Sequence, residues 1–130
     1  MSDRPPRMEI EHEVRALGEG GEVAVVIPTG DIDLATADEF AAALRRSAQA
    51  TTTDGLILDL RGVNFIDSSG LRVVLMAAQE LGRRLATVVA AGSPVSMLID
   101  LAEVADRVNP VSDEKEALAR IDRAGDDDAG

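Results

Sequence analysis

The sequence predicts an α/β sandwich, in which about four helices cover a mixed sheet of about five strands with an N-terminal antiparallel hairpin. Short apolar runs alternate along the chain with segments whose apolar residues recur at helical spacing. Turns rich in glycine or polar residues separate these segments. With 130 residues, 45% of them apolar, the chain can bury a single core.

The first two elements should be paired strands. Residues 8–16 alternate between apolar and mostly charged side chains, which is typical of an edge strand with one face in water. His12, the only histidine, should lie on the core side of this strand. A glycine-rich turn at 18–21 leads into the continuous apolar run 23–27, which indicates a strand covered on both faces. Two strands joined in this way predict a hairpin.

A first helix should begin near Thr36. Thr36 and Glu39 have the spacing of a capping box, and the helix should continue to about Ala50. Its inward residues are expected to be Phe40, Ala43, Leu44 and Ser47. After a polar connection at 51–55, residues 56–60 predict a buried strand.

A second helix, a strand and a third helix should follow. Residues 71–81 carry apolar side chains at helical spacing, and Gly82 is a typical C-terminal cap. The apolar run 85–91 predicts another strand. Ser93 is expected to cap the third helix, with Pro94 at its first position. The residues expected to face the core from this helix are Val95, Leu98 and Leu101.

The C-terminal part should hold a short last strand at Val108 and a final helix. Ser112 is expected to cap this helix, which should end at about Arg123. The three aspartates at 126–128 are flanked by glycine and alanine, which indicates a disordered acidic tail. We therefore predict a flexible N-terminus at 1–7, one domain at 8–123 and a disordered tail at 124–130.

The composition argues against several classes of function. A net charge of −11 disfavours a nucleic-acid partner, because a phosphate backbone needs a basic surface. The chain has no cysteine, so a disulfide framework and a thiolate metal site are excluded, and we expect no metal or cofactor. The first seven residues lack the apolar stretch that is typical of a signal peptide, and no apolar run reaches about eighteen residues. We therefore expect a cytoplasmic protein that has no membrane partner.

Residues 67–70, Asp-Ser-Ser-Gly, stand where an apolar segment turns into the second helix. Ser68 and Ser69 therefore fall at or beside the helix N-cap, where unpaired N–H groups and the helix dipole favour an anion. A phosphoserine would be accommodated there without unfolding the turn. The alternative is a serine that only caps the helix.

A second polar turn should lie beside this one. Residues 30–36 follow the buried strand 23–27, and the carboxyl ends of parallel strands meet at one edge of a sheet. Asp31 and Asp33 can therefore lie close to Ser68. One acid would orient the serine hydroxyl there, and a second would repel an added phosphate. Simple turn chemistry is the alternative for both acids.

The two turns resemble a pair of family signatures. Residues 30–37 (Gly-Asp-Ile-Asp-Leu-Ala-Thr-Ala) and 67–71 (Asp-Ser-Ser-Gly-Leu) resemble those of the STAS domain, specifically the bacterial anti-anti-sigma factors, or anti-sigma factor antagonists. The resemblance covers about residues 8–122 and implies a STAS-type sandwich and a regulator that is not an enzyme. Residues 102–104 (Ala-Glu-Val) replace the family's small residue and glycine, so the exit of the third helix is expected to differ.

The resemblance also implies partners and a modification site. Ser68 would be phosphorylated by an anti-sigma factor that is also a serine kinase of the GHKL type, and a serine phosphatase would reverse the modification. The unmodified protein would bind the kinase and free the sigma factor. Asp33 would hydrogen-bond Ser68. The other residues expected to support the site are Asp31, Asp67, Ser69 and Gly70.

Three more residues are candidate partner contacts. Val73 and Met76 lie off the inward stripe of the second helix, so they should form an apolar patch near Ser68 unless a neighbouring helix buries them. Thr36, in the other turn, is the third candidate.

Other functions are the alternatives. A STAS scaffold or a transporter-associated STAS module would have the same fold without a sigma factor. A hydrolase that uses Ser68 would need a Gly-x-Ser-x-Gly elbow, which the chain lacks around this residue. Nucleotide binding is disfavoured, because neither of the two common glycine-rich phosphate-binding motifs occurs.

Overall fold

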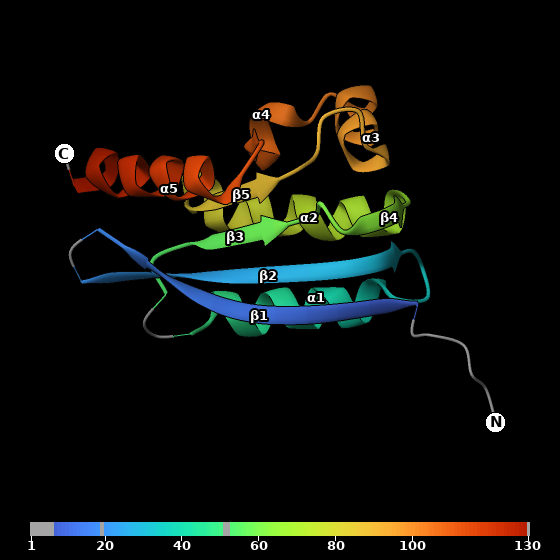
Figure 1. The fold of residues 1–130 in the computed structure, drawn as a ribbon, viewed down its shortest axis with the longest axis horizontal. Coiled ribbons are helices and arrows are strands. Elements are labelled where there is room, and N and C mark those ends of the chain that lie inside the picture. The colour runs from blue at the N-terminus through green and yellow to red at the C-terminus, as the bar shows by residue number, and fades with distance from the viewer. Residues whose placement is uncertain (1–6, 19, 51–52, 130) are drawn as a thin grey trace.

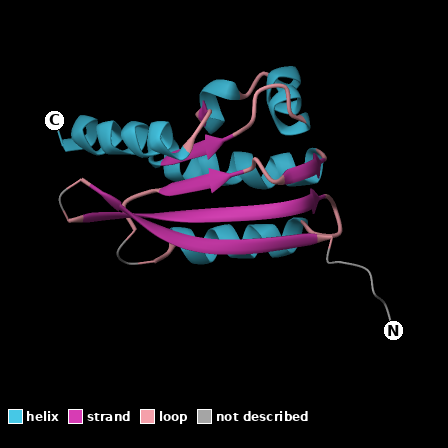
Figure 2. Ribbon diagram, in the orientation of Figure 1, coloured by secondary structure: helices cyan, strands magenta, loops and turns pink. Residues whose placement is uncertain are grey.

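The structure is a computed structural model that describes residues 7–18, 20–50 and 53–129. In this part of the chain a mixed sheet of six strands has helices on both faces (Figures 1 and 2). The strands are β1 (Met8–Leu17), β2 (Gly21–Ile32), β3 (Leu56–Asp59), β4 (Val63–Ile66), β5 (Leu85–Val88) and β6 (Pro110–Val111). Their order is β1-β2-β3-β5-β6, and β4 pairs with β2 off this path. The β1–β2 pair is antiparallel and the other pairs are parallel.

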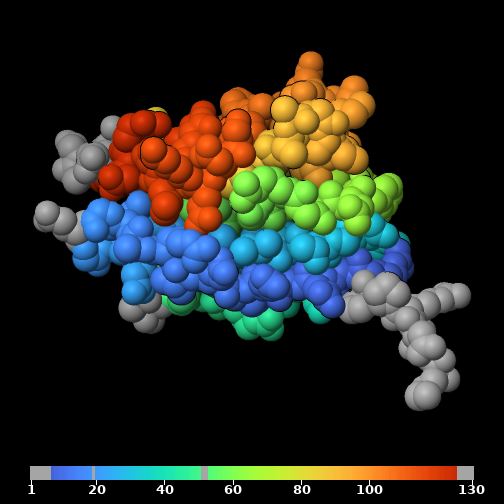
Figure 3. Space-filling view, in the orientation of Figure 1, coloured from blue at the N-terminus to red at the C-terminus, as the bar shows by residue number. Residues whose placement is uncertain are grey.

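The helices are α1 (Ala37–Ala48), α2 (Ser68–Leu81), α3 (Pro94–Ala102), α4 (Ala105–Val108) and α5 (Glu114–Ala129), with a 3-10 turn η1 (Gly82–Arg84) after α2. Phe40 of α1 and Val74 of α2 belong to the core cluster on one face of the sheet, and Ile121 of α5 belongs to the cluster on the other face. In the space-filling view the chain forms successive bands, from β1 and β2 in blue to α5 in red (Figure 3). Apolar packing on both faces explains why the central strands are continuous apolar runs.

Several predictions are confirmed. The hairpin is present, with Leu17 opposite Gly21, and β1 lies at the edge of the sheet. Gly82 ends α2 with a φ of 55°. The side chain of Ser93 caps α3 by accepting a hydrogen bond from the N–H of Ser96 at 3.2 Å. Four parts of the prediction lie outside the described residues, namely positions 1–6, 19, 51–52 and 130.

Two elements go beyond the prediction. β4 is a strand of only four residues, too short to stand out from the turn that precedes Ser68. Val108, predicted as a strand, is the last residue of α4. Asn109 then adopts a left-handed conformation (φ 54°) that ends this helix, so the strand begins only at β6.

Two helix caps differ from the predictions. Thr36 makes no capping hydrogen bond for α1. Asp113, rather than Ser112, caps α5, because its Oδ1 accepts a hydrogen bond from the N–H of Glu116 at 2.8 Å. This helix also continues past Arg123, and Ala124 is only 3% exposed, so the chain is still helical and packed where the disordered tail was predicted to begin.

Three side chains on the surface also differ from the predictions. His12 is exposed, and its Nδ1 lies 3.2 Å from Oγ of Ser47, so it is not a core histidine. Leu101 is 79% exposed, and Ile99 faces the core from α3 instead. Glu103 ends α3 in a left-handed conformation (φ 57°), and its N–H donates to the carbonyl of Asp100 at 3.2 Å. The exit of α3 therefore keeps the usual helix-end geometry without a glycine.

Candidate functional site

The two predicted turns meet at the carboxyl edge of the sheet. β4 pairs with the end of β2, and Ile66 lies opposite Ile32 (Figure 1). The N–H of Asp67 donates to the carbonyl of Ile32 at 3.1 Å. The residues that follow β2 therefore lie beside the first turn of α2, as the parallel arrangement of the strands requires.

Asp67 is the N-cap of α2. Its backbone is extended, and its Oδ1 accepts hydrogen bonds from the N–H groups of Ser69 at 2.9 Å and Gly70 at 3.2 Å. Its carbonyl accepts the N–H of Leu71 at 3.0 Å. The N-terminal amides that were expected to be open to an anion are thus largely occupied by Asp67 itself. Ser68 and Ser69 lie in the first helical turn and do not cap the helix.

Ser68 is the more accessible of the two serines. It is exposed, whereas Ser69 is half-buried. Within the described part of the chain, no hydrogen bond holds the Ser68 hydroxyl. This hydroxyl is therefore accessible from outside the protein.

Gly70 allows α2 to approach the end of β2. A Cβ atom at position 70 would lie 2.7 Å from Cγ2 of Ile32 and 2.8 Å from Cγ1 of Ile66. Both distances are shorter than carbon atoms tolerate, so any larger residue would push the helix away. Gly70 thus keeps the first turn of α2 close to the ends of β2 and β4.

Asp33 organises the turn that follows β2. Its carboxylate accepts hydrogen bonds from the N–H groups of Ala35 at 3.0 Å and Thr36 at 3.3 Å, and it forms an ion pair with Arg7. The Asp33 side chain is only 14% exposed. Among the described residues no hydrogen bond joins Asp33 to Ser68, so the structure places this carboxylate in its own turn.

Thr36 is a structural residue of the same turn. It is 8% exposed. Its hydroxyl donates to the carbonyl of Asp31 and accepts from the N–H of Asp33, each at 2.9 Å. This explains the missing helix cap, and it leaves little of Thr36 exposed to a partner.

The two predicted apolar contacts on α2 differ in exposure. Met76 is 55% exposed, whereas Val73 is half-buried and packs against the core. Both residues line a cavity of about 70 Å³ between α1 and α2. Met76 lies eight positions beyond Ser68, or roughly 12 Å along the helix axis.

Three residues near the site were missed by the sequence analysis. Arg7, assigned there to a flexible terminus, pairs with Asp33, and its carbonyl accepts the N–H of Asp31 at 2.7 Å. Leu34 is 79% exposed and Phe65 is 50% exposed. Leu34 stands out as an apolar residue in a polar turn, which is a signal for surface contact. No local pattern indicates the role of Arg7, because its partners are more than twenty residues away.

The connection that leads from β3 into β4 is held by an ion pair. Asp59 accepts hydrogen bonds from Arg61 through both carboxylate oxygens, at 3.0 Å from Nε and 2.8 Å from Nη2. The hydrogen bond to Asp59 is the main cause that raises the pKa of Arg61 above its ordinary value. This ion pair lies in the turn that leads into β4.

Two other features, a metal site and a membrane-spanning helix, are not found among the described residues. No group of three or more histidine, aspartate or glutamate side chains is arranged to hold a metal ion. A search of the same residues finds no helix with the length and apolar character needed to cross a membrane.

Comparisons with known proteins agree on the fold. The family model of the STAS domain matches residues 16–117. A crystal structure of an anti-sigma factor antagonist from Mycobacterium paratuberculosis is similar over 87% of this chain and 94% of its own, with 24% identity and a TM-score of 0.70. The anti-sigma factor antagonist SpoIIAA in its unphosphorylated form is similar over 85% and 96%, with 18% identity and a TM-score of 0.63.

A third similar structure is much larger. The murine anion transporter Slc26a9 matches 90% of this chain with 22% of its own length, at 13% identity and a TM-score of 0.63. No curated protein sequence matches the chain. At these identities the structural similarities establish a SpoIIAA-like fold.

Proposed function

Because the chain belongs to the STAS domain family, we propose that it is an anti-sigma factor antagonist that is switched by phosphorylation of Ser68. The unphosphorylated protein binds a cytoplasmic anti-sigma factor, a serine kinase of the GHKL type, and thereby frees the sigma factor. Phosphorylation ends this binding until a serine phosphatase removes the phosphate. The protein is thus a regulator of transcription and not an enzyme.

The observation that carries this proposal is the exposed, unbonded hydroxyl of Ser68 at the start of α2. Exposed apolar side chains flank it, because Leu34 and Phe65 lie on the two segments that meet at this edge. Large apolar side chains gathered on a surface mark a protein interface. Met76, further along α2, is exposed as well.

A phosphate at Ser68 acts through charge and not through refolding. It adds about two negative charges directly beside the Asp67 carboxylate, with Asp31 nearby on β2. The amides of Ser69 and Gly70 already bond to Asp67, so they are not free to neutralise the phosphate. In a closed interface this charge costs a few kcal/mol, and each 1.4 kcal/mol is about tenfold in affinity.

Asp33 supports the switch as a positioning residue. Its bonds to Arg7, Ala35 and Thr36 hold the turn against which the first turn of α2 lies. Asp33→Asn keeps an acceptor but removes the charge that pairs with Arg7. We therefore expect it to slow phosphorylation of Ser68 while the fold persists.

The test is phosphorylation by the cognate GHKL kinase with ATP, followed by site-resolved mass spectrometry. We expect phosphate on Ser68, and a Ser69→Ala variant that is modified like the wild type. Ser68→Ala should bind the kinase and resist inactivation, with stability unchanged within about 0.5 kcal/mol. Phosphate found mainly on Ser69 would overturn the assignment.

A STAS module of a scaffold or transporter is the second candidate, and the match to part of Slc26a9 favours it. In that case the protein would bind a partner, but no GHKL kinase would modify Ser68. A Ser68→Asp variant that retained its partner as well as Ser68→Ala does would support this alternative.

A further inference from the structure

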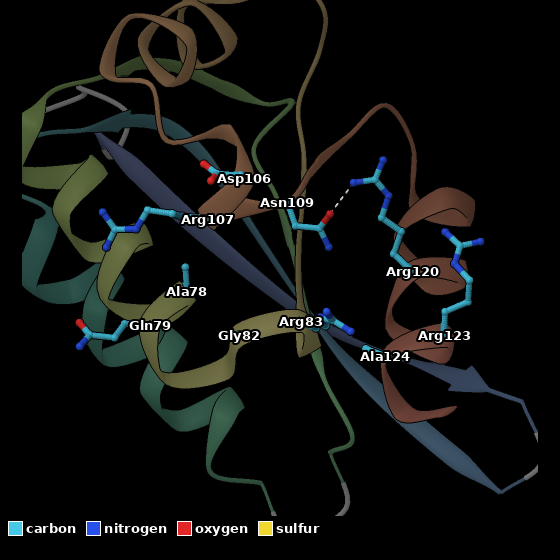
Figure 4. Close-up of a pocket in the computed structure, with 10 residues that line it drawn as sticks. All are labelled: Ala78, Gln79, Gly82, Arg83, Asp106, Arg107, Asn109, Arg120, Arg123 and Ala124. Carbon is cyan, nitrogen blue, oxygen red and sulfur yellow. Dashed lines mark hydrogen bonds between the residues drawn. The ribbon is translucent and has the colours of Figure 1, made fainter. Parts of the chain in front are cut away.

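A hollow of about 670 Å³ lies at the end of α2 opposite to Ser68. Four arginines line it, and they come from three separate parts of the chain (Figure 4). Arg83 belongs to η1, Arg107 to α4, and Arg120 and Arg123 to α5. We call this hollow the arginine pocket.

The charge of the arginine pocket is opposite to that of the protein. The chain carries a net charge of −11. Among the residues that line the pocket, four arginines face a single acid, Asp106. A concave surface of one charge in a chain of the other sign focuses the electrostatic field on that spot. The pocket is therefore a place where this acidic protein can attract an anion.

One of these arginines is fixed and two are available. Arg120 donates to Oδ1 of Asn109, as Figure 4 shows, and to Oε1 of Glu116 at 3.1 Å. Asn109 is itself held, because its Nδ2 donates to the carbonyl of Leu85 at 3.2 Å. Arg107 and Arg123 are exposed, and within the described part of the chain neither side chain makes a hydrogen bond or an ion pair.

We propose that the arginine pocket binds a small anionic ligand with two or more phosphate groups. A guanidinium binds phosphate through two parallel hydrogen bonds, and several of them suit several phosphates. The volume falls in the usual range of small-molecule sites, roughly 300–1,000 Å³. Arg120 is already paired with Glu116, so the need for more than one phosphate comes from Arg107 and Arg123: a ligand with at least two phosphates gives each of these two guanidiniums a phosphate to bind.

The pocket recognises the phosphates and not a base. No aromatic side chain lines it, since the chain has no Trp or Tyr and its two phenylalanines, Phe40 and Phe65, lie in α1 and β4. A base would therefore lack an aromatic surface to stack on. Tripolyphosphate and ATP should bind with similar affinity, and AMP and inorganic phosphate much more weakly.

This site is independent of the proposed switch. α2 has 14 residues, so its two ends are roughly 20 Å apart. Binding at the arginine pocket should therefore not depend on Ser68, so tripolyphosphate should bind Ser68→Ala and the wild type with equal affinity.

The experiment is isothermal titration of the full chain with tripolyphosphate at about 50 mM salt, where phosphate contacts are strong. The test variant is Arg107→Ala/Arg123→Ala. The control is Arg45→Ala/Arg46→Ala, which removes the same charge from the exposed last turn of α1. We expect at least a tenfold loss of affinity, or about 1.4 kcal/mol, for the test variant and less than about a twofold loss for the control.

Amide chemical shifts locate the site directly. On addition of tripolyphosphate we expect the largest changes near Gly82, Arg107 and Arg120. Equal losses for the two double variants, changes centred on Ser68, or no binding by the wild type would overturn the proposal. Tighter binding of an oligo-aspartate peptide than of tripolyphosphate would also overturn it, in favour of an acidic protein partner.

Discussion

At the N-terminal end of α2 the polar and packing contacts are made within the protein, whereas the C-terminal end borders a hollow lined by four arginines. At the first end Asp67 binds two helix amides, and Gly70 packs against Ile32. At the second end Gly82 stops the helix in open space, since no atom lies within 4 Å of where its Cβ would be.

This difference indicates how each end can act. The residues around Ser68 stabilise the fold, so a switch there has to work through the exposed hydroxyl alone. The side chains of Arg107 and Arg123 make no hydrogen bond or ion pair within the described residues, so their charge is available to a ligand. The following variants test whether the N-terminal end of α2 contributes mainly to stability and the arginines at its C-terminal end contribute little to it.

Gly70→Ala should have the largest effect on stability. The new methyl group collides with Ile32 and Ile66, and overpacking of this kind typically costs about 1–3 kcal/mol, partly offset by the better helix propensity of alanine. Gly125→Ala in α5 is the matched control, because nothing lies within 4 Å of its Cβ position. The free energy of unfolding of this control should rise by up to about 1 kcal/mol. Urea denaturation measures both, and similar gains for the two variants would show that the first turn of α2 is not tightly packed.

Asp67→Ala should have the next largest effect. It removes the side chain that accepts two helix N–H groups, so we expect a loss of about 1 kcal/mol. Asp67→Asn keeps an acceptor oxygen, so its free energy of unfolding should fall by only about a few tenths of a kcal/mol. If the asparagine variant lost as much as the alanine variant, charge and not hydrogen bonding would stabilise this end.

The smallest effect is expected at the other end of α2. Arg107→Ala/Arg123→Ala should change the free energy of unfolding by less than about 0.5 kcal/mol, because exposed side chains without partners contribute little. Thermal and urea denaturation would both reveal a larger loss. A loss above about 1 kcal/mol would mean that these arginines hold α4 and α5 in place.

Much of the fold follows from local patterns. Alternation predicted β1, a continuous apolar run predicted the core of β2, and Gly82 and Ser93 marked helix ends. The rule that parallel strands end at one edge of a sheet correctly predicts that the two polar turns lie together. These features depend on short segments and on general topology, which a single sequence contains.

The contacts that the sequence did not indicate join distant segments. Thr36 has the spacing of a helix cap, but its hydroxyl is already hydrogen-bonded to the carbonyl of Asp31 and the N–H of Asp33. The pairing of Arg7 with Asp33 spans 26 positions. The arginine pocket likewise combines residues from η1, α4 and α5, so no local motif signals it.

The central claim is that phosphate at Ser68 switches off binding without changing the fold. The direct test is to titrate the GHKL kinase into the unmodified protein and into protein with phosphoserine installed at position 68. We predict a loss of affinity of at least about 100-fold, or roughly 2.7 kcal/mol, with circular dichroism and thermal stability nearly unchanged because Asp67 still caps α2. Equal affinities of the two forms for the kinase would contradict the account.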